Sequence, residues 1–161
     1  MTRPRARAAF GTTLFLVLAP GVVAGVIPWW LTGWNSEDIW APLRVLGGAL
    51  IVTGAAVLLH AFARFVVEGL GTPAPIAPTE RLVIGGLYRY VRNPMYLAVG
   101  ATIVGQSLLL GRLGLLAYAA AFGAAVFTFV RLYEEPTLAQ RYGEEYEAYR
   151  RAVPGWWPRR P

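Results

Sequence analysis

Long uncharged stretches separate short arginine-rich stretches along this chain. Four stretches of 18 or more residues carry no charged side chain, namely 8–36, 45–63, 93–111 and 113–130. A helix needs about 20 apolar residues to cross a bilayer, and these stretches lack the polar face of a helix on a soluble protein. We therefore predict an all-α polytopic membrane protein, with buried helices of a soluble bundle as the alternative. The predicted transmembrane helices cover about 9–31, 44–66, 94–110 and 114–132.

The arginines predict how these helices are oriented. All 15 basic residues are arginine, and 13 of them fall on one side of the predicted membrane, with only Arg44 and Arg112 on the other. Because cytoplasmic loops are enriched in basic residues, we expect both termini to be cytoplasmic. The first apolar stretch is longer than the apolar core of a signal peptide, so we interpret it as a span.

Composition narrows the chemistry. The chain is 56% apolar with a mean hydropathy of +0.46, has no cysteine and has His60 as its single histidine. Disulfides, thiolate metal sites and histidine clusters are therefore excluded, and neither common spacing of a glycine-rich phosphate loop occurs. A formal charge of +6 in so apolar a chain favours anionic lipid headgroups over nucleic acid as partners. We interpret His60, within the second predicted span, as a hydrogen-bonded packing residue.

One polar stretch, Arg81–Tyr96, contains paired glycines followed by alternating tyrosines and arginines. Near its end, Asn93 is a preferred residue just before a helix, and Pro94 suits the first helical position. We therefore predict that a helix begins at Asn93. Its free backbone N–H groups would point back at the polar stretch, where they would attract an anion.

A second polar segment, Glu134–Leu138, follows the last predicted span. The short turn at 111–114 predicts that the third and fourth spans form a hairpin, which brings 93–96 close to 131–135. Together the two polar segments predict a pocket at the membrane surface. It would offer a helix start for a carboxylate, a carboxylate for an amine, and aromatic rings for a flat or sulfonium-bearing group. A cofactor that contains an amino acid fits this description.

Two further segments flank these motifs. Residues 69–80 contain three prolines and are predicted to be extended, either as a linker or as a wall of the site. Residues 137–151 are predicted to form an amphipathic helix on the cytoplasmic face of the membrane. Trp156 and Trp157 are expected at the lipid interface.

Four sequence elements occur in order between about residues 69 and 158. They are LVIGGLY, RNPMY, EEPTL and the tail YGEEYEAYRRAVP. On these elements the chain resembles the isoprenylcysteine carboxyl methyltransferase and phospholipid methyltransferase superfamily, whose members are membrane enzymes that use S-adenosylmethionine. The length predicts one membrane domain over 1–161. Its two N-terminal spans in 1–68 match the family only as hydrophobic helices, and the resemblance implies a cofactor-binding methyltransferase core in 69–161. It also implies a bacterial-type inner membrane, with the cofactor site on the cytoplasmic side.

The resemblance further implies the residues of the site. The catalytic residues are expected from the reaction itself, in which Arg92 or Arg131 would steer an anionic acceptor, and Glu135 and the tyrosines are the candidate bases. No metal is expected. The expected cofactor contacts are Leu82, Val83, Tyr88, Asn93, Pro94, Met95, Tyr96 and Glu134.

Two departures from the isoprenylcysteine type bear on the methyl acceptor. Those relatives have histidine where this chain has Asn93, and a substrate-binding arginine where it has Val130, with Arg131 beside it. We expect methyl transfer to a lipophilic acceptor that enters from the bilayer, either an isoprenylcysteine-type carboxylate or a related lipid. A phospholipid amine or a small thiol is the alternative acceptor. A non-enzymatic membrane scaffold on the same fold is the alternative function.

Overall fold

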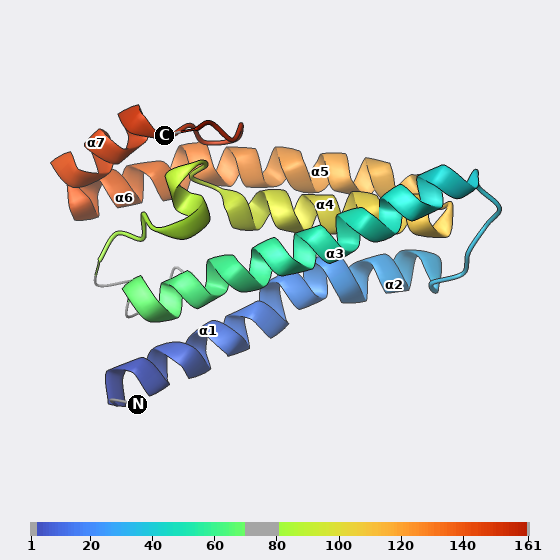
Figure 1. The fold of residues 1–161 in the computed structure, drawn as a ribbon, viewed down its shortest axis with the longest axis horizontal. Coiled ribbons are helices and arrows are strands. Elements are labelled where there is room, and N and C mark those ends of the chain that lie inside the picture. The colour runs from blue at the N-terminus through green and yellow to red at the C-terminus, as the bar shows by residue number, and fades with distance from the viewer. Residues whose placement is uncertain (1–2, 70–80, 161) are drawn as a thin grey trace.

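The computed structural model describes residues 3–69 and 81–160, which form helices joined by short loops (Figure 1). No strand occurs in these residues, so the all-α prediction is confirmed. Most of the predicted linker at 69–80 lies outside them. The α-helices are α1 (Arg3–Gly21), α2 (Ile27–Thr32), α3 (Ala41–Arg64), α4 (Pro94–Leu110), α5 (Gly114–Phe129), α6 (Glu135–Tyr142) and α7 (Glu144–Ala152). The π turns are η1 (Val22–Val26), η2 (Phe65–Gly69) and η4 (Val130–Glu134), and η3 (Gly86–Arg89) is a 3₁₀ turn.

Among the described residues, three helices are long and apolar enough to cross a membrane, namely Thr13–Thr32, Ala41–Arg64 and Gly114–Tyr142. The remaining predicted span, Pro94–Leu110, is apolar but has only 17 residues. Three of the four predicted spans are therefore long enough to cross a membrane by themselves. The last of them continues to Tyr142, beyond its predicted end at residue 132. The π turn η4 lies just before Pro136. Proline has no backbone N–H to donate and its ring clashes with the preceding turn of a regular α-helix, so the wider π turn accommodates it.

Helix α4 lies between α3 and α5 (Figure 1), and glycines bring α3 and α4 into close contact. A Cβ added to Gly47 would lie 2.5 Å from the backbone nitrogen of Leu109 and 2.6 Å from the carbonyl oxygen of Gly105. A Cβ on Gly54 would lie 2.8 Å from the carbonyl oxygen of Ala98. These contacts involve backbone, which cannot move aside like a flexible side chain. The small residues therefore set the spacing of the two helices, as is typical of helix pairs in lipid.

The π turn η1 fastens the N-terminal helices to the bundle. Gln106 donates a hydrogen bond of 2.6 Å to the carbonyl of Ala24, and Tyr118 donates one of 2.7 Å to the carbonyl of Val23. Both carbonyls belong to the π turn. A bilayer core contains no water that could hydrogen-bond to carbonyls freed by the π turn. The two side chains supply these hydrogen bonds, and they hold the π turn against α4 and α5.

At the far end of the bundle, the turn between α4 and α5 is tied to the segment that precedes α3. Gly111 adopts the left-handed conformation at the end of α4, and the predicted tight turn is confirmed. The backbone N–H of Glu37 donates to the carbonyl of Leu110 at 2.8 Å. Arg112 forms an ion pair with Glu37 and donates to the carbonyl of Asn35 at 3.0 Å. These bonds close the end of the bundle opposite α6 and α7.

The predicted amphipathic helix over 137–151 is two helices rather than one. Helix α6 ends at Tyr142, and α7 starts at Glu144. Gly143 lies between them with φ of +53°. This left-handed backbone favours glycine and ends the first helix. The break lets α7 turn back over the polar stretch that precedes α4.

Candidate functional site

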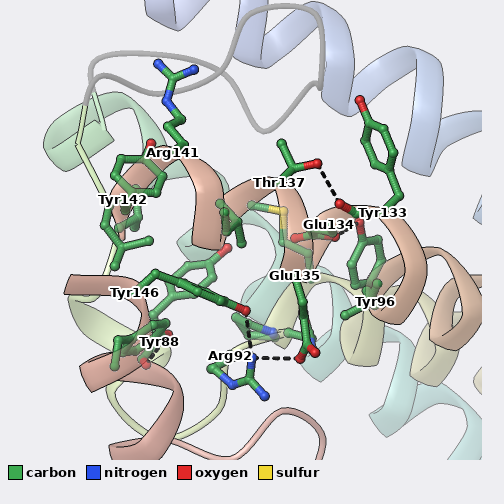
Figure 2. Close-up of a pocket in the computed structure, with 18 of the residues that line it drawn as sticks. Tyr88, Arg92, Tyr96, Tyr133, Glu134, Glu135, Thr137, Arg141, Tyr142 and Tyr146 are labelled. Carbon is green, nitrogen blue, oxygen red and sulfur yellow. Dashed lines mark hydrogen bonds and ion pairs between the residues drawn. The ribbon is translucent and has the colours of Figure 1, made fainter. Parts of the chain in front are cut away.

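A cavity of about 430 Å³ lies at the end of the bundle where η3, α6 and α7 meet. Figure 2 shows its side chains arising from the loop before α4, from the first turn of α4, and from η4, α6 and α7. Phe15 of α1 and Phe65 of η2 also line it. Among the predicted catalytic residues, Arg92 and Glu135 line the cavity and Arg131 does not. All eight predicted cofactor contacts line it, namely Leu82, Val83, Tyr88, Asn93, Pro94, Met95, Tyr96 and Glu134.

Two adjacent glutamates, Glu134 at the end of η4 and Glu135 at the start of α6, bind different partners. The Tyr96 hydroxyl donates to Glu134 Oε2 at 2.8 Å (Figure 2). Arg92 Nη1 donates to Glu135 Oε1 at 2.8 Å. Successive helical residues point about 100° apart, given 3.6 residues per turn. Glu134 therefore joins η4 to the first turn of α4, while Glu135, the first residue of α6, joins α6 to the loop that precedes α4.

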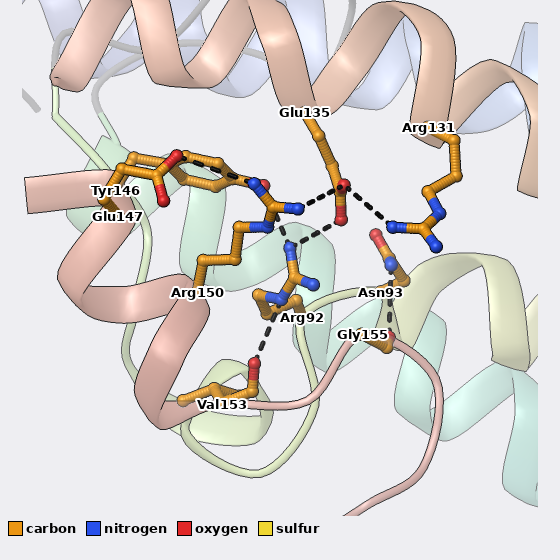
Figure 3. Close-up of polar contacts among 9 residues, drawn as sticks. All are labelled: Arg92, Asn93, Arg131, Glu135, Tyr146, Glu147, Arg150, Val153 and Gly155. Atoms are coloured by element: carbon orange, nitrogen blue, oxygen red, sulfur yellow. Dashed lines mark hydrogen bonds and ion pairs between the residues drawn. The ribbon is translucent and has the colours of Figure 1, made fainter.

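Helix α4 begins at Pro94, as the sequence predicts, but the side chain of Asn93 does not cap it. The Asn93 amide instead donates to the carbonyl of Gly155 at 3.1 Å (Figure 3). The expected capping geometry is therefore wrong, because a partner 62 residues away in sequence takes the side chain. The first backbone N–H groups of α4 remain without an Asn93 cap beside the cavity.

Arg92 is the centre of a polar network that joins three segments (Figure 3). Besides Glu135, it donates to the hydroxyl of Tyr146 at 2.9 Å and to the carbonyl of Val153 at 3.0 Å. Its side chain is 13% exposed, and that of Glu135 is 9% exposed. A buried guanidinium bound in this way fixes the loop before α4 to both α6 and α7.

The C-terminal tail crosses over the same loop. The backbone N–H of Arg92 donates to the carbonyl of Pro154 at 2.9 Å, and the backbone N–H of Arg159 donates to the carbonyl of Tyr90 at 3.0 Å. With the side-chain bonds to Val153 and Gly155, these bonds hold the tail against residues 90–93. The sequence indicates no such role for the tail, because its acceptors are backbone carbonyls.

Tyrosines form one wall of the cavity. The Tyr149 hydroxyl donates to the backbone carbonyl of Tyr88 at 2.7 Å, and the rings of Phe65 and Tyr88 meet edge to face at 5.7 Å. Burial, together with the neighbouring Tyr149 phenol, raises the pKa of Tyr88 well above its usual value. Burial also raises the pKa of Tyr149, although Arg92 opposes the shift. These phenols are therefore neutral at physiological pH. Tyr146 and Tyr149 were missed as site residues, although their spacing of three on an amphipathic helix was a usable signal.

The paired glycines of the polar stretch rest against the end of α3. Glu68 accepts hydrogen bonds from Arg64 at 2.5 Å and from the backbone N–H of Gly85 at 3.0 Å. Gly86 has φ of +57°, and a Cβ there would lie 2.6 Å from His60 Nε2. His60 thus packs against Gly86 and does not line the cavity.

Much of the chain matches a known family. A family model described as phospholipid methyltransferase matches residues 43–145. The chain belongs to the phospholipid methyltransferase family. No curated protein matches the chain. The family implies a methyltransferase, and the apolar helices indicate a membrane protein. The match covers all eight predicted cofactor contacts and ends just before Tyr146 and Tyr149, which also line the cavity.

Proposed function

We propose that this protein is an integral membrane methyltransferase that moves a methyl group from S-adenosylmethionine to a lipophilic acceptor. The observation that carries the proposal is that all eight residues expected to contact the cofactor line one cavity. At about 430 Å³ it falls within the usual range for small-molecule sites, roughly 300–1,000 Å³. Family membership supports the reaction class.

The chemistry of the lining fits S-adenosylmethionine. Glu134 offers a carboxylate to the methionyl ammonium, and Tyr96 keeps that carboxylate in place. The first backbone N–H groups of α4 suit the methionyl carboxylate, since a helix start attracts anions. The Tyr88 and Tyr96 rings suit the adenosine and the sulfonium cation. Asn93 contributes by holding the tail, because its amide is bonded to Gly155.

S-adenosylmethionine supplies a methyl group that is already activated as part of a sulfonium. The protein therefore needs no nucleophile, and its side chains have to bind, orient and exclude water. The neutral phenols of Tyr88 and Tyr149 suit this task, because they close the wall of the cavity without adding a negative charge. The network around Arg92 holds that wall in one position relative to Glu134.

An apolar side of the cavity suits the acceptor. Phe15, Phe65, Phe129 and Tyr133 line it from α1, η2, α5 and η4. Phe129 is 38% exposed and Tyr133 is 50% exposed. We propose that the acceptor enters from the bilayer on this side, while the cofactor enters from the cytoplasm.

The acceptor class is proposed as an isoprenylcysteine-type carboxylate or a related lipid, with a phospholipid amine as the alternative that the family match favours. A small thiol is the third choice. In this proposal Arg92 and Arg131 act on an anionic acceptor through their charge. Because Glu135 is bonded to Arg92 at 2.8 Å, its contribution is to hold that arginine more than to take up a proton.

Calorimetric titration of S-adenosylhomocysteine into the purified protein in detergent tests the proposal. We expect saturable binding at one site per chain. Membranes that contain the protein should then transfer label from methyl-labelled S-adenosylmethionine into a lipid fraction, and the labelled species would identify the acceptor. A folded protein that binds no S-adenosylhomocysteine would overturn the enzyme proposal and favour a scaffold on the same fold.

A further inference from the structure

A charged pair marks the point where the apolar helix α3 ends. Arg64 and Glu68 are the first charged residues after the uncharged stretch 45–63. Arg64 Nη1 donates to Glu68 Oε1 at 2.5 Å, and the two side chains are 37% and 27% exposed. A partly exposed ion pair of this kind adds little to stability by itself. The second oxygen of Glu68 matters more, because it reaches a different segment.

That oxygen binds the backbone of the segment that carries the first expected cofactor contacts. The N–H of Gly85 donates to Glu68 Oε2 at 3.0 Å, from a position 17 residues further along the chain. A hydrogen bond to an ionised carboxylate is about twice as strong as a neutral one. Because Arg64 holds the other oxygen, the carboxylate is kept in one orientation toward Gly85. The π turn η2 is thus attached to the start of η3 at a defined point.

The approach of the carboxylate explains the first glycine of the pair. Gly85 has φ of −87° and ψ of 171°, an extended backbone that any residue adopts. A Cβ at Gly85, however, would lie 2.5 Å from Glu68 Oε2 and would overlap with the carboxylate. A side chain at this position would push the carboxylate away and break its bond to the backbone. The glycine is therefore required by its contact with Glu68 rather than by its own conformation.

The attached glycine sets the position of two cavity residues. The N–H of Tyr88 donates to the carbonyl of Gly85 at 3.1 Å, within the turn η3. Val83, two residues before Gly85, packs with Tyr88 and with Ala61 of α3 in one buried cluster. Val83 and Tyr88 line the cavity, whereas Glu68 does not. Glu68 therefore acts on a ligand only through the segment that it holds.

We propose that Glu68 is a positioning residue for the cofactor. Through the backbone N–H of Gly85, it holds the segment with Val83 and Tyr88 against the adenosine. This role rests on the proposed function, since it takes S-adenosylmethionine as the ligand. It differs from the role of Glu134, which is proposed to bind the methionyl ammonium. Loss of Glu68 should weaken every ligand that contains the adenosine, whether or not an amino acid portion is present.

Calorimetric titration of the intact protein in detergent tests this role with two ligands. They are S-adenosylhomocysteine and methylthioadenosine, which lacks the amino acid portion. Hydrogen–deuterium exchange of the peptide over 82–89 is measured in parallel without any ligand. The variants are Glu68→Ala, Glu68→Gln, Gly85→Ala and the double variant Glu68→Ala, Gly85→Ala. The control is Glu145→Ala, which removes a carboxylate from an exposed position on α7.

We expect Glu68→Ala to bind both ligands about tenfold more weakly or worse, because the segment loses a charge-assisted bond. Glu68→Gln keeps an oxygen for Gly85, so it should stay within about threefold of the parent. Gly85→Ala should match Glu68→Ala, and the double variant should be no weaker than either, since the two changes remove one contact. Exchange over 82–89 should rise about tenfold in the three variants that lack the contact and stay unchanged in Glu145→Ala.

Three results would overturn the proposal. If Glu68→Ala matched Glu145→Ala in affinity and in exchange, the bond to Gly85 would position nothing. Losses that add up in the double variant would show that Glu68 and Gly85 act separately. A loss confined to S-adenosylhomocysteine would show that Glu68 acts on the amino acid portion instead of the adenosine.

Failure of the proposed function gives a different result. A parent that binds neither ligand would overturn that function, whereas exchange, which needs no ligand, would still confirm or overturn the hold of Glu68 on residues 82–89. If Glu68→Ala fails to give the parent's circular dichroism, Gly85→Ala decides, because it breaks the same bond and keeps the carboxylate.

Discussion

The charge of Glu134 gives the sharpest test of the proposed cofactor site. Glu134 lines the cavity and accepts a hydrogen bond from Tyr96 at 2.8 Å. Glu134→Gln keeps the size of the side chain and an oxygen for Tyr96, so it removes little except the negative charge. A hydrogen bond to a charged group contributes about 1.5–3 kcal/mol. Loss of this contribution corresponds to roughly 10- to 100-fold weaker binding of a ligand whose ammonium faces Glu134.

Calorimetric titration with two ligands separates charge recognition from general damage. S-adenosylhomocysteine carries the amino acid portion, whereas methylthioadenosine lacks it. We expect Glu134→Gln to weaken S-adenosylhomocysteine by the stated factor and to leave methylthioadenosine almost unchanged. Tyr96→Phe removes the hydrogen bond that positions the Glu134 carboxylate but leaves its charge, so it should weaken S-adenosylhomocysteine less than Glu134→Gln does, by roughly 2- to 10-fold.

Two results would refute this reasoning. If Glu134→Gln weakened both ligands equally, Glu134 would support the cavity without contacting the ammonium. If neither ligand lost affinity, the cofactor would bind elsewhere or in another orientation. Circular dichroism that matches the parent is needed in each case, because Glu134 also joins η4 to α4.

Three further predictions concern the supporting structure. Gly47→Ala should lower the stability of the bundle in detergent by about 1–3 kcal/mol, whereas Gly48→Ala, whose Cβ would meet only a side-chain atom at 4.0 Å, should change thermal unfolding little. Because the pKa of Tyr149 is raised on folding, the unfolded chain loses this proton first, so stability should fall as pH rises above about 10. Tyr149→Phe should cost about 1 kcal/mol at neutral pH and reduce that alkaline loss, as measured by unfolding at pH 8 and at high pH. A chain that ends at Ala152 should keep its helical circular dichroism but bind S-adenosylhomocysteine about tenfold more weakly or worse. The reason is that it loses the hydrogen bonds between the tail and both Arg92 and Asn93. Unchanged affinity would contradict the role given to the tail.

The helices and the place of the cavity could be predicted from the sequence because their causes are local or nearly so. Apolar composition over about 20 residues is enough to indicate a span. A tight turn at Gly111 then brings the two ends of the α4–α5 hairpin together, so 93–96 and 131–135 have to lie close. The Tyr96–Glu134 hydrogen bond is the direct consequence.

The partners of individual polar side chains could not be predicted in the same way. Local rules assign Asn93 to the helix start, but the fold brings the carbonyl of Gly155 within 3.1 Å of it. Glu134 and Glu135 look equivalent in sequence, and only the phase of the helix decides that one faces Tyr96 and the other faces Arg92. The π turn η4, which ends at Glu134, changes that phase, and no local propensity indicated it.

The tail explains how a site can extend past the end of a sequence match. The family match ends at residue 145, yet Arg92 also binds Tyr146 and the carbonyls of Val153 and Pro154. A backbone carbonyl is present whatever the side chain, so most of these contacts leave no mark on the sequence. Gly155 is the exception, because a Cβ there would lie 3.2 Å from Arg92 Nη2. The loop at 90–93 is therefore held by a tail whose backbone path matters more than the identity of its side chains.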